Sequence, residues 1–330
     1  MNNPPPETRM FSQDNMKYKD IRYRVRGRKG KALLGILTFS LPAFRLTQDC
    51  GASAEDPSDR YPVGRITCPG AFLCIKGCYA LTNNFTRWER VVNKAHRAFR
   101  LSLTGEFEDA VKRELSYYHA TGVKPWQGKL SDEQRKAGMK AKTHKRRPLH
   151  LVRIHDSGDF YSPRYIEKWL RIMKWAETEM PGVGFWAYTK AVKWMKEARE
   201  RWGEKFPRNF TIVYSEGGIE DSEIDHAHDR FSRVFMNRRT LKKQGFEEGS
   251  SKKLGDIKAC FGSNRKNGIV YHSGATPFVT DPNDPAYPLS VQAAKDHIRK
   301  LGLEKFYTGR SNPKSSPMLA ALLIPGIPPL

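Results

Sequence analysis

The sequence predicts an α/β protein built on a parallel sheet, in the form of a partial or modified parallel (β/α) barrel with basic N- and C-terminal extensions. Between residues 149 and 214, short apolar segments alternate with amphipathic segments of helical length. This alternation is typical of parallel strands joined by helices. The chain of 330 residues has the size of one barrel domain with insertions, or of about two smaller domains. Beyond residue 236 the alternation weakens, so the predicted barrel is incomplete.

The first part of the chain is predicted to hold a basic arm, one buried strand and a long loop. Residues 17–31 alternate cationic and apolar side chains, which fits a strand with one basic face or an extended arm. Residues 32–46 form an apolar run and are expected to contain a buried strand. Residues 47–66 are rich in Asp, Pro and Gly, so they are expected to form a loop.

Helices and strands are then expected in alternation. Two helical patterns, at about 86–103 and 106–119, precede a basic insertion at 124–147. The insertion is followed by a strand at 149–154, a helix at 163–179, a strand at 183–188, a helix at 192–201, a strand at 210–214 and, much later, a helix at 290–301.

These segments divide the chain into three parts. They are a basic tail or arm (1–31), a barrel-like core (32–235) with insertions at 44–66 and 124–147, and a basic C-terminal extension (236–330). No run reaches the roughly 18–20 apolar residues of a membrane helix, and the N-terminus lacks the basic-then-apolar order of a secretion signal. We therefore expect a cytoplasmic protein that does not enter a membrane.

Charge predicts a polyanionic partner. Lys and Arg total 58 against 35 Asp and Glu, which gives a net charge of +23 and an isoelectric point near 9.9. An excess of this size favours DNA or RNA as the partner, although any single basic run is more often a solvated surface. Three runs are candidates, at 17–31, 135–147 and 238–266. The residues expected to contact nucleic acid are Arg22, Arg24, Arg26, Arg28, Lys142, Lys145, Arg146 and Arg147.

Three of the five cysteines, Cys68, Cys74 and Cys78, lie within eleven residues at the spacing C-x5-C-x3-C. In a reducing compartment, clustered thiols indicate a metal centre rather than disulfides. Three thiolates fit a [4Fe–4S] cluster with one iron left open. A structural zinc site needs a fourth ligand, which Cys50, Cys260 or a histidine would supply. The spacing leaves iron–sulfur, zinc and uncoordinated thiols as alternatives.

Polar and small residues follow each of the three strands predicted between residues 149 and 214. Ligands bind at the carboxyl ends of parallel strands, so these residues are expected to line one pocket. Carboxylates, a lysine and small residues suit a zwitterionic, hydroxyl-rich small molecule. The alternative is that Asp159 or Ser162 only caps the helix that begins at Pro163. The predicted ligand-binding residues are His155, Asp156, Ser157, Gly158, Asp159, Thr189, Lys190, Ser215 and Glu216.

The order of these features resembles that of radical S-adenosylmethionine enzymes. In that superfamily a three-cysteine loop after the first strand binds a [4Fe–4S] cluster, and a Gly-Gly-Glu type motif after the second strand holds the methionyl amine. Here the cysteine loop comes first, and Ser157-Gly158-Asp159 is similar to the second motif. The resemblance implies a [4Fe–4S] cluster on the three cysteines and S-adenosylmethionine in the adjoining pocket. The usual spacing in the superfamily, C-x3-C-x2-C, differs from the one found here.

Residues 32–216 carry four further motifs, which are Thr38-Phe39-Ser40-Leu41-Pro42-Ala43, Thr67-Cys68-Pro69-Gly70-Ala71, His155-Asp156-Ser157-Gly158-Asp159-Phe160 and Phe185-Trp186-Ala187-Tyr188-Thr189-Lys190. Together these motifs resemble the phage gene product 88 family more closely. This resemblance implies a phage protein that acts in the host cytoplasm, but no particular reaction. Members often carry a second cysteine cluster near the C-terminus, where this chain has only Cys260.

Together the two resemblances imply an iron–sulfur, radical S-adenosylmethionine-like enzyme that acts on or near nucleic acid, for example by modifying a base.

The alternative function is a zinc-containing nucleic-acid-binding protein, or a replication initiator of the nickase type, without radical chemistry. Nickases use a His-x-His pair on a strand to hold a divalent metal, and His226 and His228 form such a pair. The acidic residues around them instead favour the start of a helix. The buried face of that helix would be Phe231, Val234 and Phe235.

Overall fold

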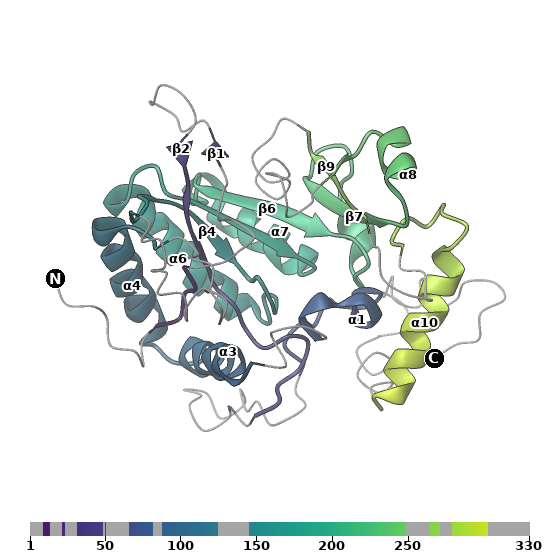
Figure 1. The fold of residues 1–330 in the computed structure, drawn as a ribbon, viewed down its shortest axis with the longest axis horizontal. Coiled ribbons are helices and arrows are strands. Elements are labelled where there is room, and N and C mark those ends of the chain that lie inside the picture. Colours follow the sequence, from purple (N-terminus) through teal and green to yellow (C-terminus); the bar gives the residue numbers. More distant parts are fainter. Residues whose placement is uncertain are drawn as a thin grey trace, which may run out of the picture.

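A curled sheet of parallel strands forms a half-barrel that is flanked by helices (Figure 1). This computed structural model describes residues 9–13, 22–23, 32–48, 50, 66–81, 88–124, 145–248, 264–270 and 279–302. All neighbouring pairs in the sheet are parallel, which confirms the predicted α/β partial barrel. In order across the sheet, the strands are β3 (Gly35–Thr38), β4 (Leu149–Ile154), β5 (Gly184–Thr189), β6 (Phe210–Ser215), β7 (Phe231–Phe235), β9 (Lys266–Val270) and β8 (Glu247–Glu248).

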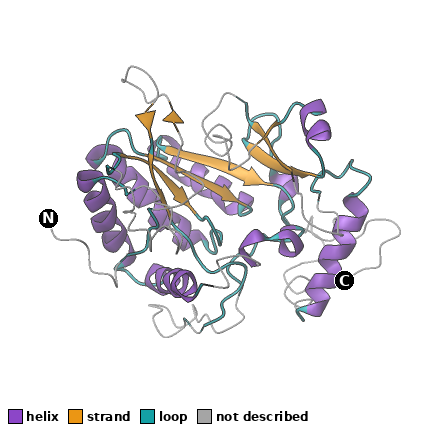
Figure 2. Cartoon of the chain, viewed as in Figure 1, coloured by secondary structure: helices purple, strands orange, loops and turns teal. Residues whose placement is uncertain are grey.

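Helices connect and cover these strands (Figure 2). A separate antiparallel pair, β1 (Arg22–Tyr23) and β2 (Ala32–Leu33), leads into β3. None of the described helices combines the length and the hydropathy that a membrane crossing requires. The helices are α1 (Cys74–Gly77), α3 (Glu89–Ser102), α4 (Phe107–Thr121), α6 (Pro163–Glu179), α7 (Val192–Trp202), α8 (Arg238–Lys243) and α10 (Tyr287–Lys300), with 3-10 turns η4 (Tyr79–Leu81), η5 (Gly203–Lys205) and η6 (Asp221–Glu223).

The start of α6 shows how local sequence sets an element boundary. The Ser162 hydroxyl accepts a hydrogen bond from the Tyr165 N–H at 3.2 Å, and Pro163 occupies the first helical position, where its missing N–H is not needed. Ser162, rather than Asp159, is therefore the cap. The strand at 149–154 and the helix at 163–179 have the predicted bounds.

The segment around β7 corrects the sequence prediction of a helix there. Phe231, Val234 and Phe235 have the spacing of one helical face, but residues 231–235 form a strand between β6 and β9. A five-residue segment with three apolar side chains is too short for periodicity to separate helix from strand, and hydrogen bonding to strands on both sides decides for the strand. Two strands beyond residue 235, β8 and β9, extend the same sheet.

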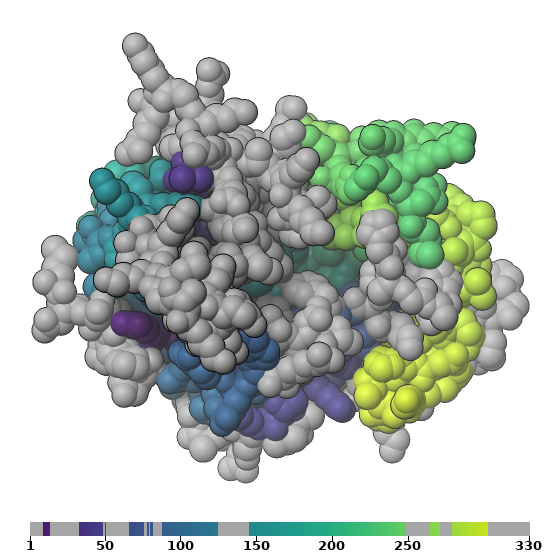
Figure 3. Space-filling view, viewed as in Figure 1, coloured from purple at the N-terminus to yellow at the C-terminus, as the bar shows by residue number. Residues whose placement is uncertain are grey.

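Most of the core lies between the sheet and its flanking helices. Trp169 of α6 is fully buried, and its ring packs edge to face with Phe39 at 5.1 Å and Phe107 at 5.7 Å between centroids. Such pairs contribute about 0.5–1.5 kcal/mol each beyond the area they bury. A second core joins α10 to α1 and the residues just before α1. Figure 3 shows α10, in yellow, at the surface of the molecule. Its members include Phe72, Ile75, Val291, Ala294 and Ile298.

The N-terminal residues 9–13 cover the open edge of the sheet at β3. Ser12 and Thr38 exchange two backbone hydrogen bonds of 2.8 and 2.9 Å, so the segment protects an edge that would otherwise be open to pairing. The buried carboxyl of Glu114 on α4 accepts the N–H of Met10 at 2.7 Å and of Phe11 at 3.2 Å. Burial raises the pKa of Glu114 to about 7, although these N–H groups act in the opposite direction.

We predict that Glu114 makes the fold less stable as the pH rises from about 5 to 8. In the unfolded chain its pKa is about 4.3, so the folded protein retains a proton over this window. Stability that is present below the unfolded pKa is then lost as the pH passes the folded pKa, by up to about 3 kcal/mol. Urea unfolding of wild type and Glu114→Gln at each pH tests this. The stability advantage of the wild type should shrink with rising pH, and an advantage that grows would contradict a protonated Glu114.

Candidate functional site

The cysteine segment, residues 67–81, lies across the carboxyl edge of the sheet, next to the ends of β5 and β6 (Figure 1). The Leu73 N–H donates to the Gly217 carbonyl at 2.8 Å, and the Ile219 N–H donates to the Gly70 carbonyl at 3.0 Å. The segment therefore pairs, antiparallel, with the loop that follows β6. This edge is where parallel α/β proteins bind ligands.

Close backbone approach fixes this docking. A Cβ atom on Gly70 would lie 2.5 Å from the carbonyl oxygen of Lys190, so only glycine lets the segment come this near to the end of β5. At the start of the segment, the Thr67 hydroxyl donates to the Pro42 carbonyl at 2.9 Å and the Thr67 N–H donates to the Phe44 carbonyl at 2.7 Å. The segment is thus held from both sides by contacts within the protein.

The three thiols of this segment lie close enough for the charge of one to affect another. Burial raises the pKa of Cys68 well above its ordinary value, and Asp159, Cys78 and Cys74 add to this effect. Burial also raises the pKa of Cys74 and that of Cys78, the latter to about 11. Backbone groups hydrogen-bond to each sulfur and act in the opposite direction. The thiols are therefore neutral at pH 7 unless a metal centre displaces their protons.

Metal binding by this segment stays a prediction. Within the described part of the chain, no three His, Cys, Asp or Glu side chains are arranged to hold one metal ion. A structural zinc site would need a fourth ligand beside the three cysteines. Cys50 is buried in the main core, with its sulfur 3.7 Å from the Gln48 carbonyl oxygen. Cys260 lies outside the described residues.

Asp159 ties the loop after β4 to the end of β5. Its carboxylate accepts hydrogen bonds from the Thr189 hydroxyl at 2.7 Å, the Lys190 N–H at 2.9 Å and the Phe160 N–H at 2.7 Å. Burial raises the pKa of Asp159, although these donors act in the opposite direction. The side chain therefore acts as a brace between two strand ends, and its charge opposes ionisation of Cys68.

Lys190 ties the end of β5 to the end of β6. Its ammonium group donates to the Ser215 carbonyl at 2.7 Å, the Ser215 hydroxyl at 3.1 Å and the Glu216 carbonyl at 2.6 Å. A lysine has three N–H donors, so these bonds occupy all of them. Its charge lowers the pKa of Cys74, because a fixed cation stabilises a neighbouring thiolate.

Glu216 belongs to a buried ionic network beside the same edge. Its carboxylate is 4% exposed and accepts two hydrogen bonds from Arg233, at 2.6 and 2.9 Å, and one from His226 at 2.7 Å. His228 instead bonds to Asp225 at 2.7 Å. The two histidines thus lie in a turn and are bonded to different carboxylates, an arrangement that does not favour a metal shared between them.

Asp156, Ser157 and Gly158 shape the loop after β4. Asp156 forms an ion pair of 3.0 Å with Arg153, and the Ser157 hydroxyl donates to the Leu41 carbonyl at 2.6 Å. Gly158 has a left-handed φ of 79° and packs against Leu41, a conformation that favours glycine. These residues join the loop to the segment that follows β3.

His155 lies among aromatic side chains in the core. Its Nε2 is 3.0 Å from the Tyr165 hydroxyl, and its ring packs edge to face with Phe160 and Phe39. The backbone φ of 62° is left-handed, which breaks the strand alternation after β4. Burial lowers the pKa of His155 to about 3, so the ring is neutral. Its Nδ1 has no hydrogen-bond partner among the described residues.

The structure therefore separates the predicted ligand-binding residues into two groups. Asp159, Thr189, Lys190, Ser215 and the Glu216 backbone gather at the edge where the cysteine segment lies. The other residues, at positions 155–158, hold the loop that precedes this edge. Ligand binding by either group stays a prediction.

Sequence reasoning missed Asp221. Its carboxylate accepts the N–H groups of Gly217 at 2.7 Å and Gly218 at 2.9 Å, and so holds the turn that pairs with the cysteine segment. Burial raises the pKa of Asp221 to about 6, although Lys190 lowers it. An aspartate shortly after a Gly-Gly pair is a recognisable turn signal. Three further residues of the same network come from distant segments and give no local signal in the sequence. Arg233 forms an ion pair with Asp281, and the charges of Asp221 and Glu216 raise the pKa of Tyr287.

The described part of the predicted nucleic-acid surface lies at the opposite end of the sheet. Arg146 donates to the Gly122 carbonyl at 3.0 Å, and Arg147 pairs through its backbone with Val123, just before β4 begins. Lys145 adjoins them and is exposed, and Arg22 belongs to β1, which pairs with the strand just before β3. Of the remaining predicted contacts, Arg24, Arg26, Arg28 and Lys142 lie outside the described residues.

Comparison with known proteins gives a family and little beyond it. The family model described as "Gene product 88" matches residues 22–272. The "Gene 88 protein" of Mycobacterium phage L5 is 44% identical over 46 residues, a match that covers 14% of this chain and 18% of that protein. No solved structure matches the chain.

We predict that acid destabilises the fold through His155. The pKa of histidine in an unfolded chain is about 6.5, so below this pH the unfolded chain takes up a proton that the folded chain does not. Stability is therefore lost as the pH falls from about 6.5 towards 3. His155→Asn tolerates the left-handed backbone and does not titrate. Urea unfolding between pH 4 and 7 should show that the free energy of unfolding falls more steeply with falling pH for wild type than for the variant, by up to about 1.4 kcal/mol per pH unit. Parallel plots of this free energy against pH would contradict a neutral, buried His155.

Proposed function

This chain belongs to the Gene product 88 family, and we propose that it is an iron–sulfur enzyme of the radical S-adenosylmethionine type that acts on nucleic acid. One observation carries the proposal. A three-cysteine segment pairs through its backbone with the carboxyl edge of a parallel half-barrel, the edge at which such folds bind ligands. Backbone hydrogen bonds and the close approach at Gly70 hold the segment at this edge.

The three cysteines would hold a [4Fe–4S] cluster and leave one iron without a protein ligand. The bound cluster would supply the electron for reductive cleavage of S-adenosylmethionine. Because burial raises the pKa of all three thiols, cluster assembly must displace their protons. Lys190 favours the thiolate of Cys74, and the backbone hydrogen bonds to the sulfurs are of the kind that tune a cluster's reduction potential.

S-adenosylmethionine suits the charges around the cysteine segment. Its sulfonium and amine are cationic, and the carboxylates of Asp159 and Asp221 both act on the thiols of this segment. The Lys190 ammonium and the Asp159 carboxylate are already hydrogen-bonded within the protein. We therefore assign Lys190 and Asp159 to bracing the strand ends. We assign attraction of the cationic co-substrate to the electrostatic field of the Asp159 and Asp221 carboxylates, which acts without direct contact.

Nucleic acid is the proposed substrate class. A net charge of +23 favours a polyanion, and a base or sugar carries C–H bonds on which radical chemistry acts. The zinc alternative differs in its ligand count, because a structural zinc site would need a fourth ligand beside the three cysteines.

Anaerobic reconstitution with iron and sulfide tests the cluster. We expect a brown protein with about four irons per chain, and loss of colour and iron in Cys74→Ala. Cys50→Ala is the matched control, since Cys50 lies in the main core, and it should retain the cluster. With dithionite and S-adenosylmethionine, the wild type should release 5′-deoxyadenosine. A colourless protein with one zinc per chain would refute the proposal.

We also predict that Gly70→Ala lowers the iron content without unfolding the protein. The added Cβ would lie 2.5 Å from the Lys190 carbonyl oxygen, so the cysteine segment must move away from β5. Gly182→Ala is the control, because its Cβ would meet nothing within 4 Å. Its left-handed φ of 92° makes it the more strained backbone position of the two, since Gly70 has no positive φ. Iron content after reconstitution and far-UV circular dichroism are the measurements. Equal iron in the two variants would show that docking against β5 does not matter for the cluster.

A further inference from the structure

A buried tyrosine–histidine pair connects the loop after β4 to the first turn of α6. The hydroxyl of Tyr165 lies 3.0 Å from Nε2 of His155, and both side chains are buried. The charge of Asp159 raises the pKa of Tyr165 as well as that of the Cys68 thiol. The pair therefore lies within electrostatic range of the carboxylate that braces the carboxyl edge of the sheet.

Packing alone does not account for a histidine at position 155. Its ring lies among Phe39, Phe160 and Tyr165, where an apolar side chain would leave no polar atom unpaired. The Nδ1 atom of His155 has no hydrogen-bond partner among the described residues, and the backbone adopts a left-handed φ of 62°. Both features cost stability. What they achieve is contact between one imidazole nitrogen and one buried hydroxyl.

The hydrogen bond between the two side chains runs from the Tyr165 hydroxyl to Nε2 of His155. Burial lowers the pKa of His155 to about 3 and raises that of Tyr165 well above its ordinary value, so both groups are neutral. A neutral imidazole has one nitrogen that accepts a hydrogen bond, and this nitrogen is a stronger base than a phenol oxygen. The distance of 3.0 Å is within the range over which protons transfer.

This arrangement suits one-electron oxidation of Tyr165. A phenol that loses an electron becomes a strong acid, and it yields a neutral phenoxyl radical where a base takes its proton. Even with its lowered pKa, His155 is more basic than an oxidised phenol. The ring of Tyr161 stacks on that of Tyr165, with 4.5 Å between centroids and an interplanar angle of 18°. Because Tyr161 is the more exposed of the two, it places a second oxidisable ring nearer the surface.

We propose that Tyr165 and His155 form a redox-active pair that takes one oxidising equivalent from a high-potential organic radical. With a peroxyl radical as the oxidant, the electron passes from Tyr165 to the radical, which becomes a hydroperoxide anion. The O–H bond of Tyr165 breaks and its proton passes to Nε2 of His155, so that a neutral tyrosyl radical and an imidazolium remain. The pair removes radicals close to the carboxyl edge, and it requires neither a cluster nor S-adenosylmethionine.

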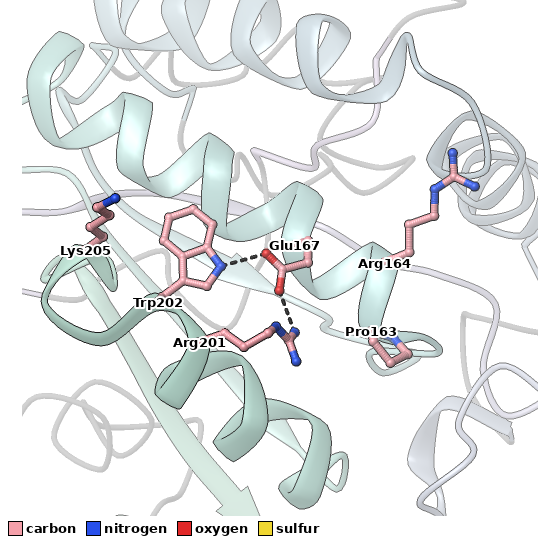
Figure 4. Close-up of a pocket in the computed structure, with 6 residues that line it drawn as sticks. All are labelled: Pro163, Arg164, Glu167, Arg201, Trp202 and Lys205. Atoms are coloured by element: carbon pink, nitrogen blue, oxygen red, sulfur yellow. Dashed lines mark hydrogen bonds and ion pairs between the residues drawn. The ribbon is translucent and has the colours of Figure 1, made fainter.

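Trp202 is a competing oxidisable ring beside α6. Its indole N–H donates to Glu167 at 2.6 Å, and Glu167 also accepts from Arg201 at 2.6 Å (Figure 4). Glu167 and Tyr165 are two residues apart, so they lie on different faces of α6. Trp202 is half-buried, and an oxidant in solution therefore reaches it more easily than it reaches Tyr165. Tryptophanyl and tyrosyl radicals have different absorption and EPR spectra, which tell the two sites apart.

Flash photolysis with ruthenium tris-bipyridine and a sacrificial electron acceptor tests the proposal on the full chain without cofactor. The flash generates ruthenium(III), a one-electron oxidant, and EPR of rapidly frozen samples identifies the radical. We expect a tyrosyl signal in the wild type and loss of most of it in Tyr165→Phe, which keeps the aromatic ring. His155→Asn should lose it as well, because asparagine accepts a hydrogen bond but takes up no proton.

Tyr118→Phe is the matched control, because it removes the hydroxyl of another buried tyrosine, on α4. This variant and Trp202→Phe should both keep the wild-type tyrosyl signal. A signal of wild-type size in a folded Tyr165→Phe or His155→Asn would overturn the proposal, as would a radical found only on Trp202. Cys74→Ala should give the wild-type signal, which separates failure of the pair from failure of the cluster.

Discussion

The approach of the cysteine segment to the strand ends is the constraint on which the rest of the site depends. Parallel strands bring all their carboxyl ends to one edge, and a segment that crosses this edge must satisfy its own backbone groups there. It does so by pairing with the loop after β6, at Leu73 and Ile219. Gly70 makes the approach to β5 possible. The three sulfurs are therefore positioned by backbone geometry, and α10 supports the same segment from outside through a core of its own.

The polar residues at this edge mostly bond to one another. Asp159 accepts three donors and Lys190 donates three times, so a ligand would meet an edge that is already braced. Such preorganisation reduces the entropy lost on binding. Under the proposed function, a charged ligand would therefore be recognised by the field of the buried carboxylates rather than by direct contacts with Asp159 or Lys190. Asp221, whose own pKa is raised by burial, contributes to that field, since its charge raises the pKa of Cys74.

Local patterns in the sequence predict the outer framework well and the site in part. The strand at 149–154 and the helix at 163–179 have strong periodicity and clear boundary residues, and both lie where expected. The failures involve long-range pairing. Residues 231–235 become a strand only because β6 and β9 lie on both sides of them. The roles of Asp221 and Arg233 likewise depend on partners brought near by the fold. His155 also follows a strand, and a left-handed φ places its ring among aromatic residues, a position that alternation alone does not reveal.

The placement of positive charge bears on how a long polymer would engage the molecule. The described basic residues before β4 lie at the amino end of the sheet, whereas the cysteine segment lies at the carboxyl edge. Screening limits interactions between exposed charges to about 8–10 Å at physiological salt, so cations at the amino end contribute little to orienting a substrate at the carboxyl edge. A polymer held only by the basic arm would thus be concentrated near the protein without being aligned. Alignment needs cations and a stacking surface near the carboxyl edge itself.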